Sequence, residues 1–355
     1  MRIAQVAPLF ESVPPRQYGG TERVVSYLTE ELVRQGHQVT LFATADSQTC
    51  AELVPIVDRP LRGNPDWMMH AVIQLERVIE RVEDFDVLHF HTDQLHYPLL
   101  RYLDVPAVTT LHGRLDLPGL QPLHEVYSDV PVVSISDAQR APLPDANWVA
   151  TVPHGLPSAL YRPGEGSGGY LAFVGRISPE KRLDRAVEIA RRARLPLRIG
   201  AKIDPADRKY FEREIEPLLA GPGIKYLGEV DDRQKRDLLA EAGALLFPID
   251  WPEPFGLVMV EAMACGTPVL AFRGGAVEEV LRNGVTGAVV DTVDEAVAAL
   301  PGVLALDRAA CREEFERRFS ARRMARDYVR VYERLMETSR RAPAPGWSAG
   351  AASHG

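Results

Sequence analysis

The hydrophobic and polar positions of the chain predict alternating strands and helices. An apolar run over residues 1–7 predicts a buried strand, and the helical spacing that follows predicts a helix that Thr21 caps and that ends at Gly36. A second strand is expected over residues 37–44. This order is typical of a βαβ unit, from which parallel α/β sheets are built.

The alternation of predicted strands and helices continues along the chain and is interrupted once. Residues 163–169 are rich in glycine, as flexible linkers are, and strand periodicity begins again after them. Further elements are expected as a helix over 67–82 and strands over 86–91, 107–112, 132–137, 170–175, 197–202, 224–230 and 244–248. Ser320 caps a last helix, whose apolar face consists of Met324, Tyr328, Val331 and Leu335. We therefore predict domains over residues 1–165 and 166–319, a C-terminal helix over 320–338 and a disordered tail over 340–355.

Composition and charge limit the possible functions. The 355 residues are 46% hydrophobic and 25% charged, which is ordinary for a globular protein of two domains. Residues 1–165 hold 12 arginines, no lysine and 21 acidic residues, a formal charge of −9, and the remainder carries +1. This distribution argues against a nucleic-acid partner and against docking of the first half on anionic lipid, so we expect membrane contact to be peripheral at most.

The cysteines and the N-terminus indicate a compartment. Three cysteines without CxxC spacing imply neither a disulfide framework nor a zinc site, which fits a reducing cytosol. The first apolar run stops at Pro8 and is too short for a signal-peptide core, and no stretch approaches a membrane span. We expect a cytoplasmic protein.

Residues 251–272 carry two glutamates in apolar surroundings. Glu253 lies in a proline-flanked turn, and Glu261 lies on the helix expected after Gly256. Burying an ionised carboxylate is costly unless it is paired, and neither glutamate has a basic residue near it in the sequence. The vicinal hydroxyls of a sugar or ribose would suit these carboxylates, because two acceptor oxygens can take two O–H donors. The alternative is a buried helix whose glutamates are satisfied by donors in the core.

Two predicted helix starts offer backbone amides to an anion. One follows Gly19 and Gly20, where the absence of side chains allows close approach of a phosphate, and the other comprises residues 255–257. Sugar, phosphate and ribose sites together indicate a nucleotide sugar. The alternative for the glycine pair is a plain turn before a helix.

Two further features point to an anion and to a ligand. Arg176 and Lys181 flank a Ser-Pro turn before a helix, so both cations can converge on one anion, although a surface charge cluster is the alternative. His112 ends a strand and precedes Gly113, at the edge where open α/β sheets place ligand-contacting residues. The alternative there is a capped strand end.

Other site classes are disfavoured. His89 and His91 share one face of a strand and would allow a metal pair, but no third ligand has convincing spacing, so we predict no metal site. No G-x-G-x-x-G follows either first strand, which argues against a nicotinamide dehydrogenase.

Four motifs resemble the retaining glycosyltransferases of family 4. E-P-F-G-L-x-x-x-E-A-M-A-C-G-T-P-V, which starts at Glu253, resembles the family's E-x7-E signature. Y-G-G-T-E-R-V-V resembles its donor-phosphate loop, G-R-x-x-x-E-K its pyrophosphate clamp, and T-L-H-G the loop beside the transferred sugar. The resemblance extends to about residue 338 and implies the GT-B fold. In this fold two doubly wound Rossmann-like domains face each other across a cleft, and the C-terminal helix crosses back to the first domain.

The resemblance also implies roles for individual residues. The acceptor would bind the first domain and the nucleotide sugar the second, with Glu253 at the hexose, Glu261 at the ribose, and His112 beside the transferred sugar. Arg176 and Lys181 would hold the departing diphosphate. The other predicted donor contacts are Gly19, Gly20, Phe255, Gly256 and Leu257, together with Gly200, Lys202 and Val230, which lie where relatives hold the nucleobase. The predicted acceptor-side residues are Ser136 and Arg140. The chain departs from the family at His154, where many relatives have Asn.

The activity that the resemblance implies is transfer of a hexose from a nucleoside diphosphate to an acceptor hydroxyl with retention of configuration. The acceptor would be a saccharide, a lipid-linked saccharide or a small molecule, and no metal or other cofactor is expected. Two alternatives remain, a nucleotide-sugar 2-epimerase of the same architecture and a non-catalytic sugar-nucleotide-binding protein. The base, the sugar and the acceptor stay open.

Overall fold

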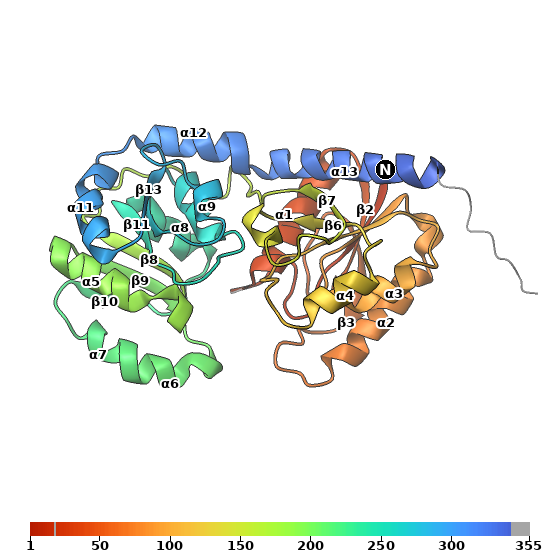
Figure 1. The fold of residues 1–355 in the computed structure, drawn as a ribbon, viewed down its shortest axis with the longest axis horizontal. Coiled ribbons are helices and arrows are strands. Elements are labelled where there is room, and N and C mark those ends of the chain that lie inside the picture. The colour runs from red at the N-terminus through yellow and green to blue at the C-terminus, as the bar shows by residue number, and fades with distance from the viewer. Residues whose placement is uncertain (18, 342–355) are drawn as a thin grey trace, which may run out of the picture.

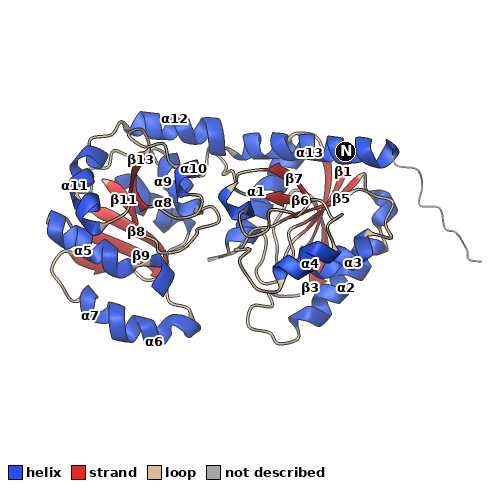
Figure 2. Cartoon of the chain, in the orientation of Figure 1, coloured by secondary structure: helices blue, strands red, loops and turns tan. Residues whose placement is uncertain are grey.

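Two parallel sheets covered by helices make up the protein, whose computed structural model describes residues 1–17 and 19–341 (Figures 1 and 2). Each sheet is the centre of an α/β unit, and the two units lie side by side under a pair of long helices (Figure 1). The predicted fold of two doubly wound domains is confirmed. Tyr18 and most of the predicted tail, residues 342–355, lie outside the described residues, whereas residues 340 and 341 end the last helix.

The first sheet is built around the N-terminal strand. In the described residues its order is β3-β2-β1-β4-β5-β6-β7, with every neighbouring pair parallel. Strand β1 lies between β2 and β4 and is buried along most of its length, because helices cover both faces of a parallel sheet. The strands are β1 (Arg2–Val6), β2 (Gln38–Thr44), β3 (Glu52–Val57), β4 (Val87–Phe90), β5 (Ala107–Thr110), β6 (Val132–Ser134) and β7 (Trp148–Thr151). The α-helices are α1 (Gly20–Arg34), α2 (Trp67–Ile79), α3 (Tyr97–Leu100) and α4 (Leu120–Val126).

The second sheet has the order β10-β9-β8-β11-β12-β13 in the described residues and is also parallel. Its strands are β8 (Leu171–Arg176), β9 (Leu197–Lys202), β10 (Ile224–Tyr226), β11 (Ala244–Phe247), β12 (Val269–Phe272) and β13 (Gly287–Val290). Its α-helices are α5 (Leu183–Ala193), α6 (Arg208–Tyr210), α7 (Glu216–Leu219), α8 (Asp232–Glu241), α9 (Leu257–Ala264), α10 (Val277–Val280) and α11 (Val293–Leu304).

The last helix returns to the first unit, as predicted. Helix α12 (Arg308–Phe319) packs on α9 of the second unit, whereas α13 (Ala321–Arg341) runs along the first unit beside α1 (Figure 1). The apolar face of α13 is buried, and Tyr332 accepts a hydrogen bond from Gln5 of β1. None of the described helices is both long and apolar enough to cross a membrane.

Some predicted boundaries are wrong. Helix α1 begins at Gly20 with Gly19 as its N-cap, so Thr21 is not the cap, because the first turn already closes between the Arg23 amide and the Gly19 carbonyl. The Ser-Pro turn expected between Arg176 and Lys181 is a 3-10 turn over Pro179–Lys181, and after a left-handed Arg182 (φ 50°) the helix begins at Leu183.

Several elements were not predicted. Strand β3 contains a proline and lies at the sheet edge, and helices α8 and α12 are dominated by charged residues, so their apolar periodicity is weak. The strand predicted over residues 224–230 ends at Tyr226.

The predicted flexible linker is held by the second unit. The amides of Gly164, Gly166 and Gly168 donate to carbonyls of Cys265, Ala240 and Glu241. A Cβ at Gly164 would lie 2.3 Å from the Ala240 carbonyl oxygen. The glycines therefore permit close backbone packing rather than flexibility.

Candidate active site

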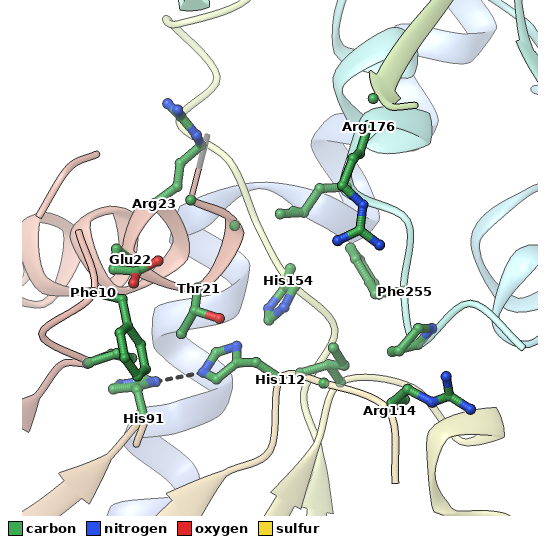
Figure 3. Close-up of a pocket in the computed structure, with 18 of the residues that line it drawn as sticks. Phe10, Thr21, Glu22, Arg23, His91, His112, Arg114, His154, Arg176 and Phe255 are labelled. Atoms are coloured by element: carbon green, nitrogen blue, oxygen red, sulfur yellow. Dashed lines mark hydrogen bonds between the residues drawn. The ribbon is translucent and has the colours of Figure 1, made fainter. Parts of the chain in front are cut away.

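A cavity of 860 Å³ lies between the two units and is lined by residues of both. His91 and His112 follow strands β4 and β5 of the first sheet. Arg176 and Lys202 are the last residues of β8 and β9 in the second sheet. The carboxyl edges of both sheets therefore contribute to one cavity, part of which Figure 3 shows.

Glu253 is 8% exposed and has a tertiary partner of opposite charge. Lys181 Nζ forms a salt bridge with Glu253 Oε2, and Trp251 Nε1 donates to the same oxygen at 3.0 Å. The ammonium also lies 4.8 Å from the centre of the Trp251 ring and 5.5 Å from that of Phe247. The carboxylate is thus neutralised by a lysine that the sequence analysis had assigned to a phosphate.

Glu261 is also paired, through residues that the sequence analysis missed. Lys235 Nζ forms a salt bridge with Glu261 Oε1, and Tyr161 Oη donates to that oxygen at 2.8 Å. Lys235 Nζ lies 3.4 Å from Asp232 Oδ1, and Asp232 forms a salt bridge with Arg23 of α1. Alternating charges therefore connect Glu261 with the first unit. As in the alternative considered for this stretch, donors of the protein itself contact both glutamates.

The second predicted cation, Arg176, lies among carboxylates. Its guanidinium forms salt bridges with Glu180 at 2.5 Å and with Asp204 and Asp207 at 3.6 Å. Lys202 Nζ contacts Asp204 at 3.0 Å. Arg176 is 33% exposed at its side chain and points into the cavity (Figure 3). A bound diphosphate would share or replace these carboxylate contacts.

The two predicted helix starts lie close to each other across the cavity. Gly256 adopts a left-handed conformation (φ 83°) as the N-cap of α9, and Leu257 begins that helix. A Cβ on Gly20 at the start of α1 would lie 3.7 Å from Leu257 Cδ1, and a Cβ on Gly19 would lie 2.8 Å from Pro15 Cβ. Both glycines line the cavity, so the helix starts face one space.

The residues predicted at the nucleobase also line the cavity. A Cβ on Gly200 would approach Val230 Cγ2 to 2.9 Å, so these two residues already pack closely. Together with Lys202 they line the cavity. Their assignment to the nucleobase stays a prediction.

A chain of buried hydrogen bonds links α13 to His112. His112 Nε2 lies 2.9 Å from His91 Nδ1 (dashed in Figure 3), and His91 Nε2 lies 2.7 Å from Gln5 Oε1. Gln5 Nε2 donates to Tyr332 Oη at 3.2 Å. Because the Gln5 oxygen can only accept, His91 Nε2 carries a proton and His91 Nδ1 accepts the proton of His112 Nε2. The second ring nitrogen of His112, Nδ1, is then an acceptor, and it is buried without a hydrogen-bond partner in the protein.

The histidines of this region are held neutral. Burial lowers the pKa of His112 to about 3 and lowers the pKa values of His89, His91 and His154 well below their usual range. His154, the departure from the family, lines the cavity and stacks on His112 with ring centres 5.2 Å apart. Its ring also meets Phe255 edge-on at 4.9 Å. His154 therefore belongs to the site.

The histidine pair considered for a metal instead serves this network. His89 and His91 lie side by side with ring centres 3.9 Å apart, and His89 bridges Tyr332 and Thr110 at 2.7 Å each. In the part of the chain that the structure describes, no group of three or more His, Cys, Asp or Glu side chains is arranged to hold a metal ion.

The two predicted acceptor-side residues do not line the cavity. Ser136 is buried and donates its hydroxyl proton to the Pro254 carbonyl at 2.7 Å, so it joins the two units. Arg140 donates to Ser134 Oγ at 2.8 Å and lies over the Trp148 ring. Both side chains therefore pack against protein instead of lining the cavity, and their acceptor-side role stays a prediction.

The other predicted residues converge. The cavity is lined by His112, Arg176, Lys181, Glu253, Glu261, Gly19, Gly20, Gly200, Lys202, Val230, Phe255, Gly256 and Leu257. It is also lined by residues that the sequence analysis did not assign, among them Arg23, His91, Asp93, Arg114, His154, Asp232 and Lys235. Arg23 and Asp232 had signals in the sequence, since one follows the glycine pair and the other begins a helix with a D-x-x-Q capping box at Asp231. Their salt bridge could not be predicted from the sequence, because the two residues are far apart in the chain.

Comparison with known proteins gives two family matches that together cover most of the chain. Residues 165–318 match the model described as "Glycosyl transferases group 1", and residues 18–149 match "Glycosyltransferase Family 4". The chain is 29% identical to a phosphatidyl-myo-inositol mannosyltransferase of Mycolicibacterium smegmatis over 94% of each chain. It is 26% identical to a glycogen synthase of Mycobacterium tuberculosis over 81% of each.

A solved structure confirms the GT-B architecture. A glycosyltransferase involved in avilamycin A biosynthesis superimposes with a TM-score of 0.71 at 24% sequence identity, covering 95% of this chain and 98% of the other. At this identity the likeness shows the fold alone.

Proposed function

This chain belongs to the group 1, family 4 glycosyltransferases, and we propose that it moves a hexose from a nucleoside diphosphate to an acceptor hydroxyl with retention of configuration and without a metal ion. The two curated relatives described above are named as a mannosyltransferase and a glycogen synthase, so each transfers a hexose. These names support a hexose here without selecting one.

One observation carries the proposal. Arg176, Lys181 and the helix starts at Gly20 and Leu257 face the same cavity as Glu253. An anion placed among the first four groups would have a carboxylate nearby that can accept sugar hydroxyls. This is the combination that a sugar diphosphate requires.

The chemistry requires stabilisation of a leaving group. As the glycosidic C–O bond breaks, negative charge grows on the diphosphate and positive charge on the anomeric carbon. Arg176, Lys181 and the helix-start amides would stabilise the first charge, as preorganised donors do. The two side-chain cations would neutralise the diphosphate in the proposed metal-independent reaction.

Retention is proposed to proceed by attack on the front face of the sugar, with the leaving phosphate oxygen taking the acceptor proton. Glu253 is bound by Lys181 and by Trp251, which suits a residue that orients the sugar rather than one that attacks it. His112 lines the cavity together with Glu253 and is proposed to lie beside the transferred sugar, as the resemblance implies.

The proposal is tested first by donor binding. Thermal unfolding should be measured with UDP, GDP and ADP and with their hexose derivatives, because a ligand at a hundred times its Kd stabilises by about 2.7 kcal/mol. The preferred donor is then incubated with and without candidate acceptors, in EDTA, and followed by NMR. Glycosylated product with the donor's anomeric configuration supports the proposal. A C2-epimerised donor without acceptor would indicate the epimerase, and binding without turnover would indicate a sensor.

The two glutamates are expected to bind different parts of the donor, Glu261 the nucleoside diphosphate and Glu253 the sugar. Glu261→Gln is expected to weaken binding of the nucleoside diphosphate by roughly tenfold, because a hydrogen bond to a charged group contributes about 1.5–3 kcal/mol. Glu253→Gln should leave that affinity nearly unchanged and lower turnover of the sugar. Calorimetry with the nucleoside diphosphate and kcat with the full donor measure the two effects. Equal losses of nucleotide affinity would contradict this division.

His91 is expected to orient His112. His91→Phe keeps a ring of similar position but removes the acceptor for His112 Nε2–H. We expect turnover to fall roughly tenfold or more with a smaller change in donor affinity, since misplacement of a contacting group can cost up to about a hundredfold. His91→Asn, which can offer an acceptor oxygen, should restore part of the rate. Turnover that stays at the wild-type value in His91→Phe would exclude this role.

A further inference from the structure

The two walls of the cavity differ in chemistry. The second unit contributes charged side chains, including Arg176, Lys181, Lys202 and Lys235. The first unit contributes an apolar wall, which we define by Phe10, Leu61, Trp67, Met68, Leu95 and Leu117. A nucleoside diphosphate matches the charged wall, so the apolar wall requires a different occupant.

The apolar wall extends to the protein surface. Met68, Leu95 and Leu117 line the cavity and are nevertheless 54%, 41% and 48% exposed. Large apolar side chains that remain exposed together beside a cavity mark a binding surface, because covering them removes apolar area from water. Deeper in the cavity the wall is well ordered by packing, since the Phe10 and Trp67 rings lie 5.4 Å apart.

The surface continues along one helix. In α2 the residues after Met68 include Met69, Val72 and Ile73, which are also exposed. The wall and this helix face therefore offer one apolar path that leads out of the cavity.

The first unit also lines the cavity with charged and polar side chains, among them Glu22, Thr92 and Gln94. Arg62 forms a salt bridge with Glu11, and Arg114 forms one with Asp116 at 2.6 Å. Asp93 also lines the cavity, and burial raises the pKa of its carboxyl group. These groups can bind the hydroxyl-bearing part of an acceptor, whereas the six side chains of the apolar wall contain no carboxylate, amide or hydroxyl group for a saccharide.

We propose that the acceptor is a single amphiphilic molecule, whose hydroxyl reaches the reaction centre near His112 while an alkyl or aromatic portion lies along the apolar wall. This inference rests on the proposed transfer reaction and names its acceptor class. A single molecule fits better than a bilayer, because the wall lies inside a cavity between two units and because residues 1–165 carry a formal charge of −9, which anionic lipid would repel.

The test uses alkyl glucosides as acceptor probes with the full chain. Binding of methyl, hexyl and octyl β-D-glucopyranoside is measured by calorimetry below the micelle concentration. Affinity should rise about fourfold for each methylene that the wall covers, and at least tenfold from methyl to octyl. Met68→Asn and Leu117→Asn should remove most of this dependence on chain length. Leu304→Asn, at a similarly exposed position of the second unit, should keep it.

Each contrary result has a defined meaning. Nucleoside diphosphate binding without any dependence on alkyl chain length would overturn the amphiphile and leave the transfer reaction standing. Absence of nucleotide binding would remove the transfer reaction and this inference with it. The protein could also sediment with phosphatidylcholine or phosphatidylcholine/phosphatidylglycerol vesicles. If Met68→Asn abolished this sedimentation, the surface would be assigned to a bilayer. Dimerisation that the same variant abolishes would assign it to a second copy, and either result overturns the single-molecule acceptor.

Discussion

Replacing Arg176 or Lys181 by alanine is expected to lower turnover at saturating donor by roughly a hundredfold or more. Both cations face the cavity next to helix starts that favour an anion. Loss of one preorganised donor to a developing negative charge typically raises the barrier by about 3–4 kcal/mol, which corresponds to this factor. The measurement is kcat with the preferred donor at saturation.

The two variants should differ in stability. Lys181→Ala leaves Glu253 buried without its cation, and removing one partner of a buried pair costs about 3–5 kcal/mol. Arg176 is one-third exposed, so Arg176→Ala should lower stability much less. The double variant Lys181→Ala/Glu253→Gln should recover stability, and its turnover should fall below that of Glu253→Gln alone, which separates the structural role of Lys181 from its role in the reaction.

Matched controls are available in the same unit. Lys225 and Lys209 are exposed, and Lys225→Ala and Lys209→Ala should keep both turnover and stability. Wild-type turnover in Arg176→Ala or Lys181→Ala at saturating donor would exclude that residue from stabilising the leaving group.

Acidification is expected to unfold the first unit well before its carboxylates titrate. Five histidines of this unit are held neutral, of which His89, His91, His96 and His154 are buried and His112 is partly exposed at the cavity. Burial lowers the pKa of His96 and of His112 to about 3, and those of the other three lie well below the usual range. The unfolded chain binds protons below about pH 6.5, whereas the folded chain does not. Stability is therefore fully present above that pH and is lost as the pH falls below it.

The size of the loss follows from linkage. Each such histidine contributes a loss of about 1.4 kcal/mol by pH 5.5, so five contribute about 7 kcal/mol, which is comparable with the whole stability of many domains. Urea unfolding between pH 7.5 and 5.5 measures the slope. His96→Asn lies outside the cavity and should reduce proton uptake by about one. A flat stability profile over this interval would show that the histidines are not held neutral by the fold.

Much of the fold was predictable from the sequence, because most strands and helices have a characteristic local spacing of apolar residues. Three elements illustrate this, namely β1 with its apolar run, α13 with its helical spacing of apolar residues and α9 with its proline-flanked start. In each, the positions of the apolar residues indicate which surfaces are buried. The errors occur where charged or edge elements lack that pattern, as in α8 and β3, and at Gly164, where glycine serves close packing.

The candidate site was also predictable only in part from the sequence. The sequence by itself determined which candidate site residues lie at strand ends and helix starts. Gly19, Arg176, Glu253 and their neighbours could be identified because they occur in local motifs. Only the tertiary structure decided their partners, since Glu253 pairs with Lys181 and Glu261 with Lys235 across long separations in the chain. The apolar wall was likewise invisible, because its side chains come from separate loops and one helix that meet only in the folded molecule. Ion pairs and cavity walls depend on distances in space, and local periodicity carries no information on those distances.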